Sequence, residues 1–366
     1  MKKETSAPAT RLVQAAIGDD AAHKAVIPPL YLSSTYKMES LEDHPHYSYS
    51  RVRNPTRDHL CDALADLEEG YGAAVTSSGM AALALVLQLL KPGDLLIAPY
   101  DCYGRAYRLM AALAEKGHFK LEFMDQYASD SAQMIAAKKS RMVLIESPSN
   151  PVMRLADIES ITRTVKTQNP ECIVVCDNTF LSPALQKPLT LGADIAFHST
   201  TKFLNGHSDV VGGAVITKTK ELWDELDFWA NSFGLIGAPF DSYMTLRGLR
   251  TLNIRINKAQ DNARAIVEFL RGQDHVEALY YPGIGAMLSF ELKGDVKAFT
   301  DRLEIFALAQ SLGGTESLIC HPASMTHVAM GAEAREKAGV KENLLRLSVG
   351  IEEAEDLIAD LSTAFS

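Results

Sequence analysis

Cysteine is scarce in this chain, and its spacing excludes the sites that cysteines usually build. Five cysteines occur among 366 residues, and no two of them are separated by two residues. The five are Cys61, Cys102, Cys172, Cys176 and Cys320. We therefore expect neither a disulfide scaffold nor a cysteine-ligated zinc site, and the composition favours a reduced, cytoplasmic enzyme.

Basic residues and long apolar runs are also scarce. The chain has 36 Lys and Arg against 46 Asp and Glu, a formal charge of −10, so a nucleic-acid partner is not expected. The longest apolar stretch, residues 80–90, contains Gln88 and is too short to cross a bilayer. No apolar segment follows residues 1–6, so we expect no secretory signal and no membrane association.

The first sixty residues lack the periodicity of a packed domain. They contain turn formers such as Asn54-Pro55, together with Tyr31, Tyr36, Tyr47 and Tyr49. Disordered segments are poor in aromatic residues. We therefore expect residues 1–60 to form an arm that contacts a neighbouring subunit, the alternative being a partly ordered tail.

The rest of the chain divides into two patterns. Residues 61–242 alternate short, continuously apolar strands with helices, which indicates a mostly parallel sheet covered on both faces. The expected strands are 72–76, 94–98, 142–146, 173–176 and 194–197. Residues 243–366 read as a smaller α+β domain with strands at 286–292 and 344–348. A long helix over 242–270, which Gly248 could break, joins the two patterns.

Polar residues follow three of the expected strands, at the edge where ligands of such sheets collect. Ser78 and Gly79 open a helix after the first strand, which makes either an anion site or a plain helix cap. Asp177 follows 173–176, and Lys202 follows 194–197. Ser199 and Thr201 lie just before that lysine.

This combination suits pyridoxal phosphate. The cofactor needs a lysine for a Schiff base, a carboxylate at its pyridine nitrogen and donors for its phosphate. Lys202 and Asp177 supply the first two, and Ser199 and Thr201 would join the helix start at the phosphate. Tyr103, after strand 94–98, could stack on the ring.

The sequence resembles the cystathionine γ-synthase, γ-lyase and β-lyase family of Cys/Met-metabolism enzymes along nearly its whole length. The matching stretches are 49–51, 54–57, 78–80, 101–104, 146–151, 177–180, 199–202, 206–209, 311–314, 321–327 and 346–352. The resemblance implies an α/β fold of the aminotransferase-like type I, pyridoxal phosphate, small amino-acid substrates, and a homo-oligomer whose dimers share active sites and assemble into a tetramer.

The resemblance also implies roles for individual residues. It makes Lys202 the Schiff-base lysine, Asp177 the partner of the pyridine nitrogen and Tyr103 the stacking residue. The residues implied at the phosphate are Gly79, Met80, Ser199 and Thr201, with Tyr49 and Arg51 reaching the phosphate of the neighbouring subunit. The residues implied around the substrate are Asn150, Gln310, Ser311 and Arg346. A planar guanidinium such as that of Arg346 binds a carboxylate in a bidentate way.

Two histidines and one cysteine are candidates for chemistry, but structural roles are favoured for all three. His321 and His327 could ligate a metal, but no carboxylate or cysteine accompanies them at ligand spacing, so we expect structural histidines and no metal. Cys102 lies beside Tyr103, and a small packed residue is favoured there over a nucleophile.

The chain departs from the family pattern at three points. The γ-synthases tend to have Arg where this chain has Val52, and Glu where it has Gln310. Between Pro282 and Gly283 the family carries roughly twenty more residues, which this protein lacks unless the numbering runs across them. The first two departures affect the choice of the second substrate.

The expected reaction is a pyridoxal-phosphate-dependent γ-replacement in methionine biosynthesis. An O-acyl-homoserine, such as the O-succinyl ester, would react with cysteine to give cystathionine and the free acid. One alternative is a lyase that cleaves cystathionine or a methionine-like substrate, and another is γ-replacement with a different nucleophile. A non-catalytic homologue is disfavoured because every cofactor position is retained.

Overall fold

The computed structural model describes residues 6–366. The first five residues, where no secretory signal was expected and where the predicted arm begins, lie outside the described residues. In the described part of the chain, no helix has the length and apolar character needed to span a membrane. All five cysteines are free, and Cys102 is fully buried.

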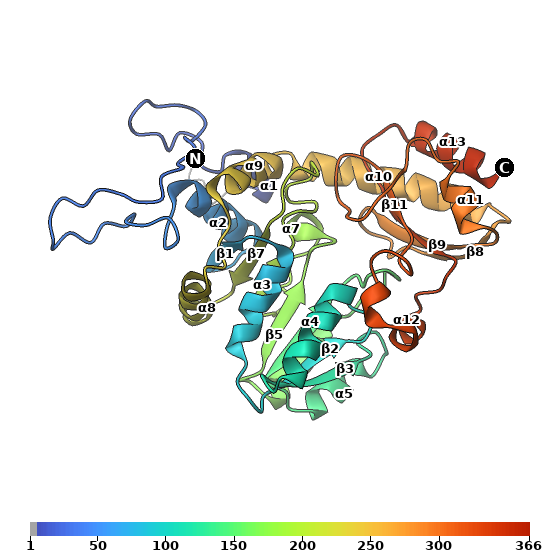
Figure 1. The fold of residues 1–366 in the computed structure, drawn as a ribbon, viewed down its shortest axis with the longest axis horizontal. Helices are drawn as coiled ribbons and strands as arrows, with labels where there is room; N and C mark the ends of the chain where they lie inside the picture. Colours follow the sequence, from blue (N-terminus) through green and yellow to red (C-terminus); the bar gives the residue numbers. More distant parts are fainter. Residues whose placement is uncertain (1–5) are drawn as a thin grey trace.

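The larger of the two sheets has the strand order β1-β7-β6-β5-β4-β2-β3 (Figure 1). Its strands are β1 (Gly72–Thr76), β2 (Leu95–Pro99), β3 (Lys120–Met124), β4 (Met142–Glu146), β5 (Ile173–Asp177), β6 (Ile195–His198) and β7 (Gly213–Thr217). All neighbours pair in parallel except β7, which runs antiparallel to β1 and β6. The expected mostly parallel sheet is therefore confirmed.

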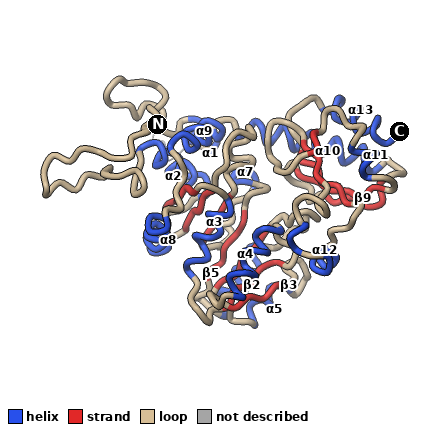
Figure 2. Tube along the Cα trace, in the orientation of Figure 1, coloured by secondary structure: helices blue, strands red, loops and turns tan. Residues whose placement is uncertain are grey.

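Helices cover both faces of this sheet (Figure 2). They are α2 (Pro55–Glu68), α3 (Gly79–Val86), α4 (Gly104–Glu115), α5 (Ser131–Ala137), α6 (Ile158–Gln168), α7 (Ser182–Leu185), α8 (Lys220–Phe233) and the 3₁₀ turn Leu87–Leu89. Leu144 and Val175 pack with α3 and α4, whereas their neighbours Val143 and Val174 pack with α5 and α6 on the opposite face. Because both faces are covered, the strands are apolar at consecutive positions.

The smaller sheet has the order β10-β11-β12-β9-β8. Its strands are β8 (Val276–Tyr280), β9 (Met287–Leu292), β10 (Ala307–Leu308), β11 (Leu318–Cys320) and β12 (Leu344–Ser348). The helices of this part are α9 (Pro239–Leu249), α10 (Leu252–Arg271), α11 (Val296–Thr300), α12 (Ala332–Ala338), α13 (Ala354–Phe365) and the 3₁₀ turn Val328–Met330. A core of α10, α11 and α13 residues packs on this sheet.

The helix expected over 242–270 is interrupted, so α9 and α10 are separate. A Cβ on Gly248 would lie 2.1 Å from the carbonyl oxygen of Asn205, and this close approach requires glycine there. The first half of α10, with Leu252 and Ile256, packs in the core shared with α2, and its second half, with Ile266, packs on the smaller sheet. This one helix therefore joins both parts of the molecule.

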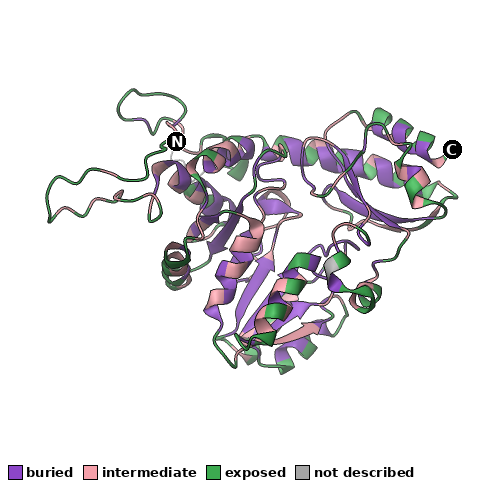
Figure 3. Ribbon diagram, in the orientation of Figure 1, coloured by how far each residue is buried: buried purple, intermediate pink, exposed green. Residues whose placement is uncertain are grey.

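The domain limits at residues 60 and 242 remain predictions. The first falls within α2 and the second within α9. The segment between α1 (Pro8–Val13) and α2 consists of long exposed loops that project from the body (Figure 3). One isolated bridge, between Thr35 and Tyr49, ties a loop of this predicted arm to itself.

The loop between β8 and β9 is short and is held by hydrogen bonds. Residues 281–286 join the two antiparallel strands, and Gly283 and Gly285 adopt positive φ of 82° and 80°. The Tyr281 hydroxyl donates to the Gly285 carbonyl at 3.1 Å, and the Gly285 N–H donates to Gln260 at 2.8 Å. The chain thus passes directly from Pro282 to Gly283 in a defined hairpin.

Candidate active site

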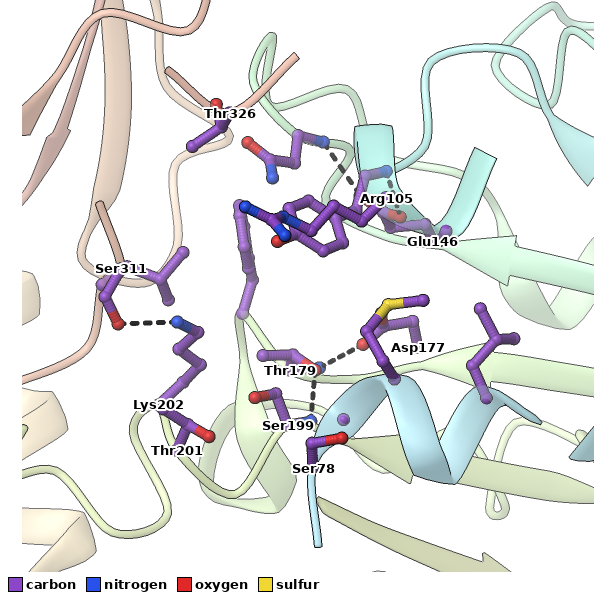
Figure 4. A pocket seen from close by; sticks show the side chains of 18 of the residues that line it. Ser78, Arg105, Glu146, Asp177, Thr179, Ser199, Thr201, Lys202, Ser311 and Thr326 are labelled. Carbon is purple, nitrogen blue, oxygen red and sulfur yellow. Dashed lines mark hydrogen bonds between the residues drawn. The ribbon is translucent and has the colours of Figure 1, made fainter. Parts of the chain in front are cut away.

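A cavity of about 370 Å³ lies at the carboxyl ends of the parallel strands, where the smaller sheet faces the larger one (Figure 4). Every predicted site residue except Tyr49 and Arg51 lines it. Those residues are Gly79, Met80, Tyr103, Asn150, Asp177, Ser199, Thr201, Lys202, Gln310, Ser311 and Arg346. The strand order thus brings together segments that are far apart in the sequence.

The start of α3 forms one wall of the cavity. The Ser78 hydroxyl caps the helix by accepting the Ala81 N–H at 3.1 Å. A Cβ on Gly79 would lie only 2.7 Å from the Cβ of Ser199, so glycine is required for this contact. The Ser199 N–H in turn donates to the Thr179 hydroxyl at 3.0 Å. The close packing sets the Ser199 side chain beside the first N–H groups of the helix, which favour an anion.

Two more predicted phosphate residues flank this wall. Met80 lies in the first turn of α3, where backbone N–H groups have no partner within the helix. The Thr201 hydroxyl donates to the Gly212 carbonyl at 3.2 Å and accepts the Gly212 N–H at 3.0 Å. These bonds hold Thr201 in place, and its hydroxyl must exchange one of them to donate to a ligand.

Lys202 points across the cavity toward Ser311 (Figure 4). Its Nζ donates to the Ser311 Oγ at 2.6 Å. Burial, with the nearby Arg346 charge, lowers the pKa of Lys202 from 10.5 to about 8, so a neutral amine is accessible near neutral pH. Ser311 has a φ of 98°, a conformation that is costly for a residue with a Cβ and that clusters at functional sites.

Arg346 is a buried cation that makes no salt bridge with a carboxylate in the described part of the chain. It is 2% exposed in β12, and its Nη1 and Nη2 donate to Asn150 Oδ1 at 2.8 Å and to the Ser311 carbonyl at 3.0 Å. Its Nε has no hydrogen-bond partner in residues 6–366. Burial lowers the pKa of Arg346, yet guanidinium groups stay charged in proteins. A buried cation whose bonds go only to neutral oxygens calls for an anionic ligand.

Asp177 ends β5, on the wall formed by the larger sheet. Its Oδ1 accepts the Thr179 N–H at 3.0 Å. Burial raises the pKa of Asp177, while the hydrogen bonds from Thr179 and the His198 charge oppose the rise. His198 lies in a fully buried pair with Glu68, its Nε2 2.7 Å from Glu68 Oε1.

Two charged residues that line the cavity were not predicted from the sequence. Glu146 ends β4 and is 7% exposed, and its two oxygens accept the backbone N–H groups of Tyr103 and Asn150 at 3.0 and 3.1 Å. A carboxylate at the end of an apolar strand was the signal that identified Asp177, and it applied equally to Glu146. Arg105 is exposed in the first turn of α4, and no sequence pattern marks it.

The two histidines weighed as metal ligands have hydrogen-bonding roles instead. His327 is fully buried, and its Nε2 donates to the Asn150 carbonyl at 2.9 Å. The two nitrogens of His321 contact the Ser324 hydroxyl and the Glu342 carbonyl, both at 2.7 Å. Residues 6–366 contain no group of three side chains that could hold a metal ion.

Tyr49 and Arg51 lie outside the cavity of their own chain. Both side chains are exposed, and the Arg51 guanidinium lies 5.5 Å from the centre of the Tyr49 ring. Arg51 Nη1 donates to the carbonyl and the side-chain oxygen of Asn231, at 2.8 and 2.5 Å. Their assignment to the neighbouring subunit stays a prediction.

Comparison with known proteins identifies relatives of the whole chain. The family model for Cys/Met metabolism PLP-dependent enzymes matches residues 9–366. The chain is 49% identical to cystathionine γ-synthase of Escherichia coli over 381 aligned residues, which cover 99% of this chain and 98% of the relative. It is 41% identical to cystathionine β-lyase of Coxiella burnetii over 97% of each chain.

The fold agrees with a solved structure of the same kind. Cystathionine γ-synthase of Xanthomonas oryzae, in complex with aminoacrylate and cysteine, superposes with a TM-score of 0.95 and 50% identity. The superposition covers 98% of this chain and 97% of that one.

Proposed function

Because the chain belongs to the Cys/Met metabolism PLP-dependent enzymes, we propose that it catalyses γ-replacement on an O-acyl-L-homoserine. In this reaction, which serves methionine biosynthesis, the thiol of L-cysteine forms a C–S bond at the γ-carbon. The γ C–O bond breaks, and the products are L-cystathionine and a carboxylic acid. The observation that carries the proposal is the linkage of Lys202 to the buried Arg346 through Ser311 in one cavity.

The residues of the cavity fit pyridoxal phosphate. The Gly79–Ser199 contact shapes an anion cradle at the start of α3, and Lys202 has an amine whose pKa is lowered to about 8. Asp177 provides a half-buried carboxylate for the pyridine nitrogen. When bound, this cofactor supplies an electron sink that acidifies the α- and β-protons of an amino acid.

The chain's own groups would then do the following. Arg346, held by Asn150, binds the α-carboxylate of the substrate in a bidentate way. The Lys202 amine, assisted by Tyr103, removes the α-proton and then a β-proton. Asp177 keeps the proton on the pyridine nitrogen.

The test is to incubate the purified protein with O-succinyl-L-homoserine, with and without cysteine. We expect cystathionine when cysteine is present and slower release of a 2-oxo acid when it is absent. Cleavage of added cystathionine that outpaces its formation would favour the lyase alternative instead. Absence of all these products would overturn the proposal.

The position of Arg105 favours a substrate whose acyl group carries a negative charge. Its side chain lines the cavity, and among residues 6–366 it makes no hydrogen bond or ion pair. A cation in the first turn of a helix is also opposed by the helix dipole, so nothing in the fold favours this charge there. A carboxylate at the far end of the acyl group, as in a succinyl ester, would pair with it.

The variant Arg105→Gln tests whether Arg105 pairs with a charged acyl group. We expect kcat/KM for O-succinyl-L-homoserine to fall about tenfold, with O-acetyl-L-homoserine little changed, because one charged hydrogen bond is lost. The exposed Arg163, which pairs with Glu159 on α6, provides a control for net charge as Arg163→Gln. Equal losses on both esters would contradict the assignment.

We also propose that the enzyme is a cytoplasmic homo-oligomer, a tetramer built from two dimers, in which Tyr49 and Arg51 reach the partner's cofactor phosphate. Large apolar side chains of the arm support an interface, since Leu32 is 70% exposed and Leu41 is 95% exposed. The reduced state of the cysteines supports the cytoplasm. Analytical ultracentrifugation tests the assembly.

A further inference from the structure

Glu146 connects two backbone segments that carry predicted site residues. Its Oε2 accepts the Tyr103 N–H at 3.0 Å, and its Oε1 accepts the Asn150 N–H at 3.1 Å. Tyr103 follows β2 and Asn150 follows β4, and the pairing of these two strands ends at Ile97 and Val143, before either residue. One buried carboxylate therefore spans the two.

On one side, Glu146 completes the start of α4. Tyr103 is the N-cap residue, and its side chain makes no capping bond. In a capping box, the third residue of the helix is Glu or Gln and accepts the N–H of the N-cap residue. That position is Ala106 in α4, which cannot do so, and Glu146 accepts the bond from a neighbouring strand. Its negative charge also suits the helix N-terminus.

On the other side, Glu146 leads to the substrate-binding groups. Asn150 Oδ1 accepts a hydrogen bond from Arg346, and Arg346 donates to the Ser311 carbonyl. The Ser311 hydroxyl accepts a hydrogen bond from the Lys202 Nζ. A continuous series of hydrogen bonds thus runs from the start of α4 to the reactive amine.

The two N–H groups bind the ionised form of Glu146 more strongly than the neutral form. Burial, together with the charges of Asp177 and Asp101, raises the pKa of Glu146 well above its usual value, while the two N–H groups favour the ion. A protonated carboxyl can still accept, but without the charge that strengthens both hydrogen bonds. A glutamine would lose one of them, because its NH₂ group would meet one of the two N–H groups.

From this geometry we infer that Glu146 is a positioning residue. It fixes the positions of Tyr103 and Asn150 relative to each other, so that the cofactor ring and the substrate α-carboxylate would be held at a fixed distance and orientation. The inference rests on the proposed function for the roles of Tyr103 and Asn150. A role in stability alone would leave the site geometry unchanged when Glu146 is replaced.

The test compares Glu146→Gln with a matched control, Glu291→Gln. Glu291 is fully buried in β9 and does not line the cavity, and each of its oxygens also accepts one bond. The donors are the Tyr280 hydroxyl at 2.6 Å and Lys341 Nζ at 2.7 Å. Both substitutions replace one buried acceptor by a donor, so both are expected to lower Tm.

The readouts are taken on the holoenzymes below both unfolding transitions. They are the visible circular dichroism of the bound cofactor and the Kd for L-norvaline, which lacks a γ-leaving group, followed by cofactor absorbance. We expect Glu146→Gln to change the dichroism and to weaken norvaline binding about tenfold, as loss of one charged hydrogen bond implies. Glu291→Gln should stay within about twofold of the wild type.

Glu146→Asp gives a second measurement if the glutamine variant does not fold. It keeps the charge with a side chain shorter by one methylene, and a smaller change of the same sign is expected. Site readouts in the Glu146 variants that match those of Glu291→Gln would overturn the inference. If these readouts change as stated but no variant or wild type forms cystathionine, the proposed reaction fails and the positioning role stands.

Discussion

Two arginines that were both assigned to anions lie in very different surroundings. Arg346 is 2% exposed in the middle of a strand, and Asn150 and Ser311 hold its guanidinium in the cavity. Arg51 is exposed on the predicted arm, and its guanidinium donates to Asn231, outside the cavity. Arg346 therefore lies among groups of its own chain that could complete an anion site, whereas Arg51 lies outside the cavity of its own chain.

A buried cation must have its ligand built around it, because leaving it unpaired is costly. Arg346 therefore lies in β12, between β11 and β9 of the smaller sheet, and donates to Asn150, which follows β4 of the larger sheet. An exposed arginine is solvated and carries no such cost, so it can lie on a loop and bind its anion only when another surface packs against it. A shared site is the physical consequence if the missing surface belongs to another copy of the chain.

The largest expected effect comes from a hybrid of two inactive variants. Lys202→Ala and Arg51→Ala should each reduce activity about a thousandfold, since one loses the proton carrier and the other a phosphate contact. In a hybrid dimer one site keeps both residues. Random co-assembly should therefore restore about one quarter of wild-type activity, because half of the dimers are hybrids with one intact site of two.

Subunits with two different affinity tags allow the hybrid to be purified and its activity measured directly. Mixtures of each variant with itself serve as controls. If verified hybrids remain as inactive as their parents, the site is contained in one chain and the comparison of the two arginines loses its basis.

Replacing each arginine by glutamine should separate their roles. Arg346→Gln removes a buried charge that the α-carboxylate needs, so we expect KM for the amino-acid substrate to rise about 100-fold with the cofactor retained. Arg51→Gln should instead raise the Kd for pyridoxal phosphate, measured by dialysis and absorbance. Should Arg51→Gln raise only the substrate KM, its assignment to the phosphate is wrong.

The buried His327, close to Arg346, gives a prediction for how the stability of the fold depends on pH. Burial and the Arg346 charge lower the pKa of His327 from 6.5 to about 4, so the folded protein binds this proton less tightly than the unfolded chain does. Its contribution to stability is fully present above pH 6.5 and is lost as the pH falls through about 4, by at most about 3 kcal/mol.

Tm measured between pH 7 and pH 4 should therefore fall less steeply for His327→Gln than for the wild type. The amide can still donate to the Asn150 carbonyl, so the variant should fold. Parallel curves for the two proteins would show that His327 does not titrate in this range.

The parts of the fold predicted from the sequence are those with a local signal. Strands β4 and β5 each have four consecutive apolar residues before their final acidic residue, and the sequence marks them to within one or two residues. β3 lies at the sheet edge with an exposed lysine at its start, and its mixed pattern hides it. The antiparallel insertion of β7 between β1 and β6 depends on long-range pairing, which no local pattern records.

The site follows the same division. Asp177 and Lys202 could be identified because they follow apolar strands whose ends must meet at one edge. Ser311 and Arg346 come from the other sheet, and only the family resemblance brought them to the site, since periodicity does not say which surfaces face each other. Arg105 was missed because an isolated arginine on a helix is usually solvated.

The smallest expected effect concerns the pair that differs from the γ-synthase pattern, Gln310 and Val52. Gln310 lines the cavity with an exposed side chain that donates weakly to the Met325 carbonyl at 3.4 Å, whereas Val52 is 39% exposed on the arm. Gln310 thus belongs to the wall of the cavity, and Val52 to the predicted arm. Neither carries the charge that would bind the amino group or the carboxylate of cysteine.

We therefore expect weak selection for cysteine, with release of a 2-oxo acid or use of another nucleophile competing with replacement. The double variant Gln310→Glu with Val52→Arg should raise kcat/KM for cysteine about fivefold and lower the elimination share, because charge-assisted hydrogen bonds exceed neutral ones by about 1 kcal/mol. Each single variant, assayed beside it, shows whether the gain needs both the cavity and the arm. If the wild type already saturates at low cysteine with negligible elimination, and the double variant gains nothing, these two positions do not select the nucleophile.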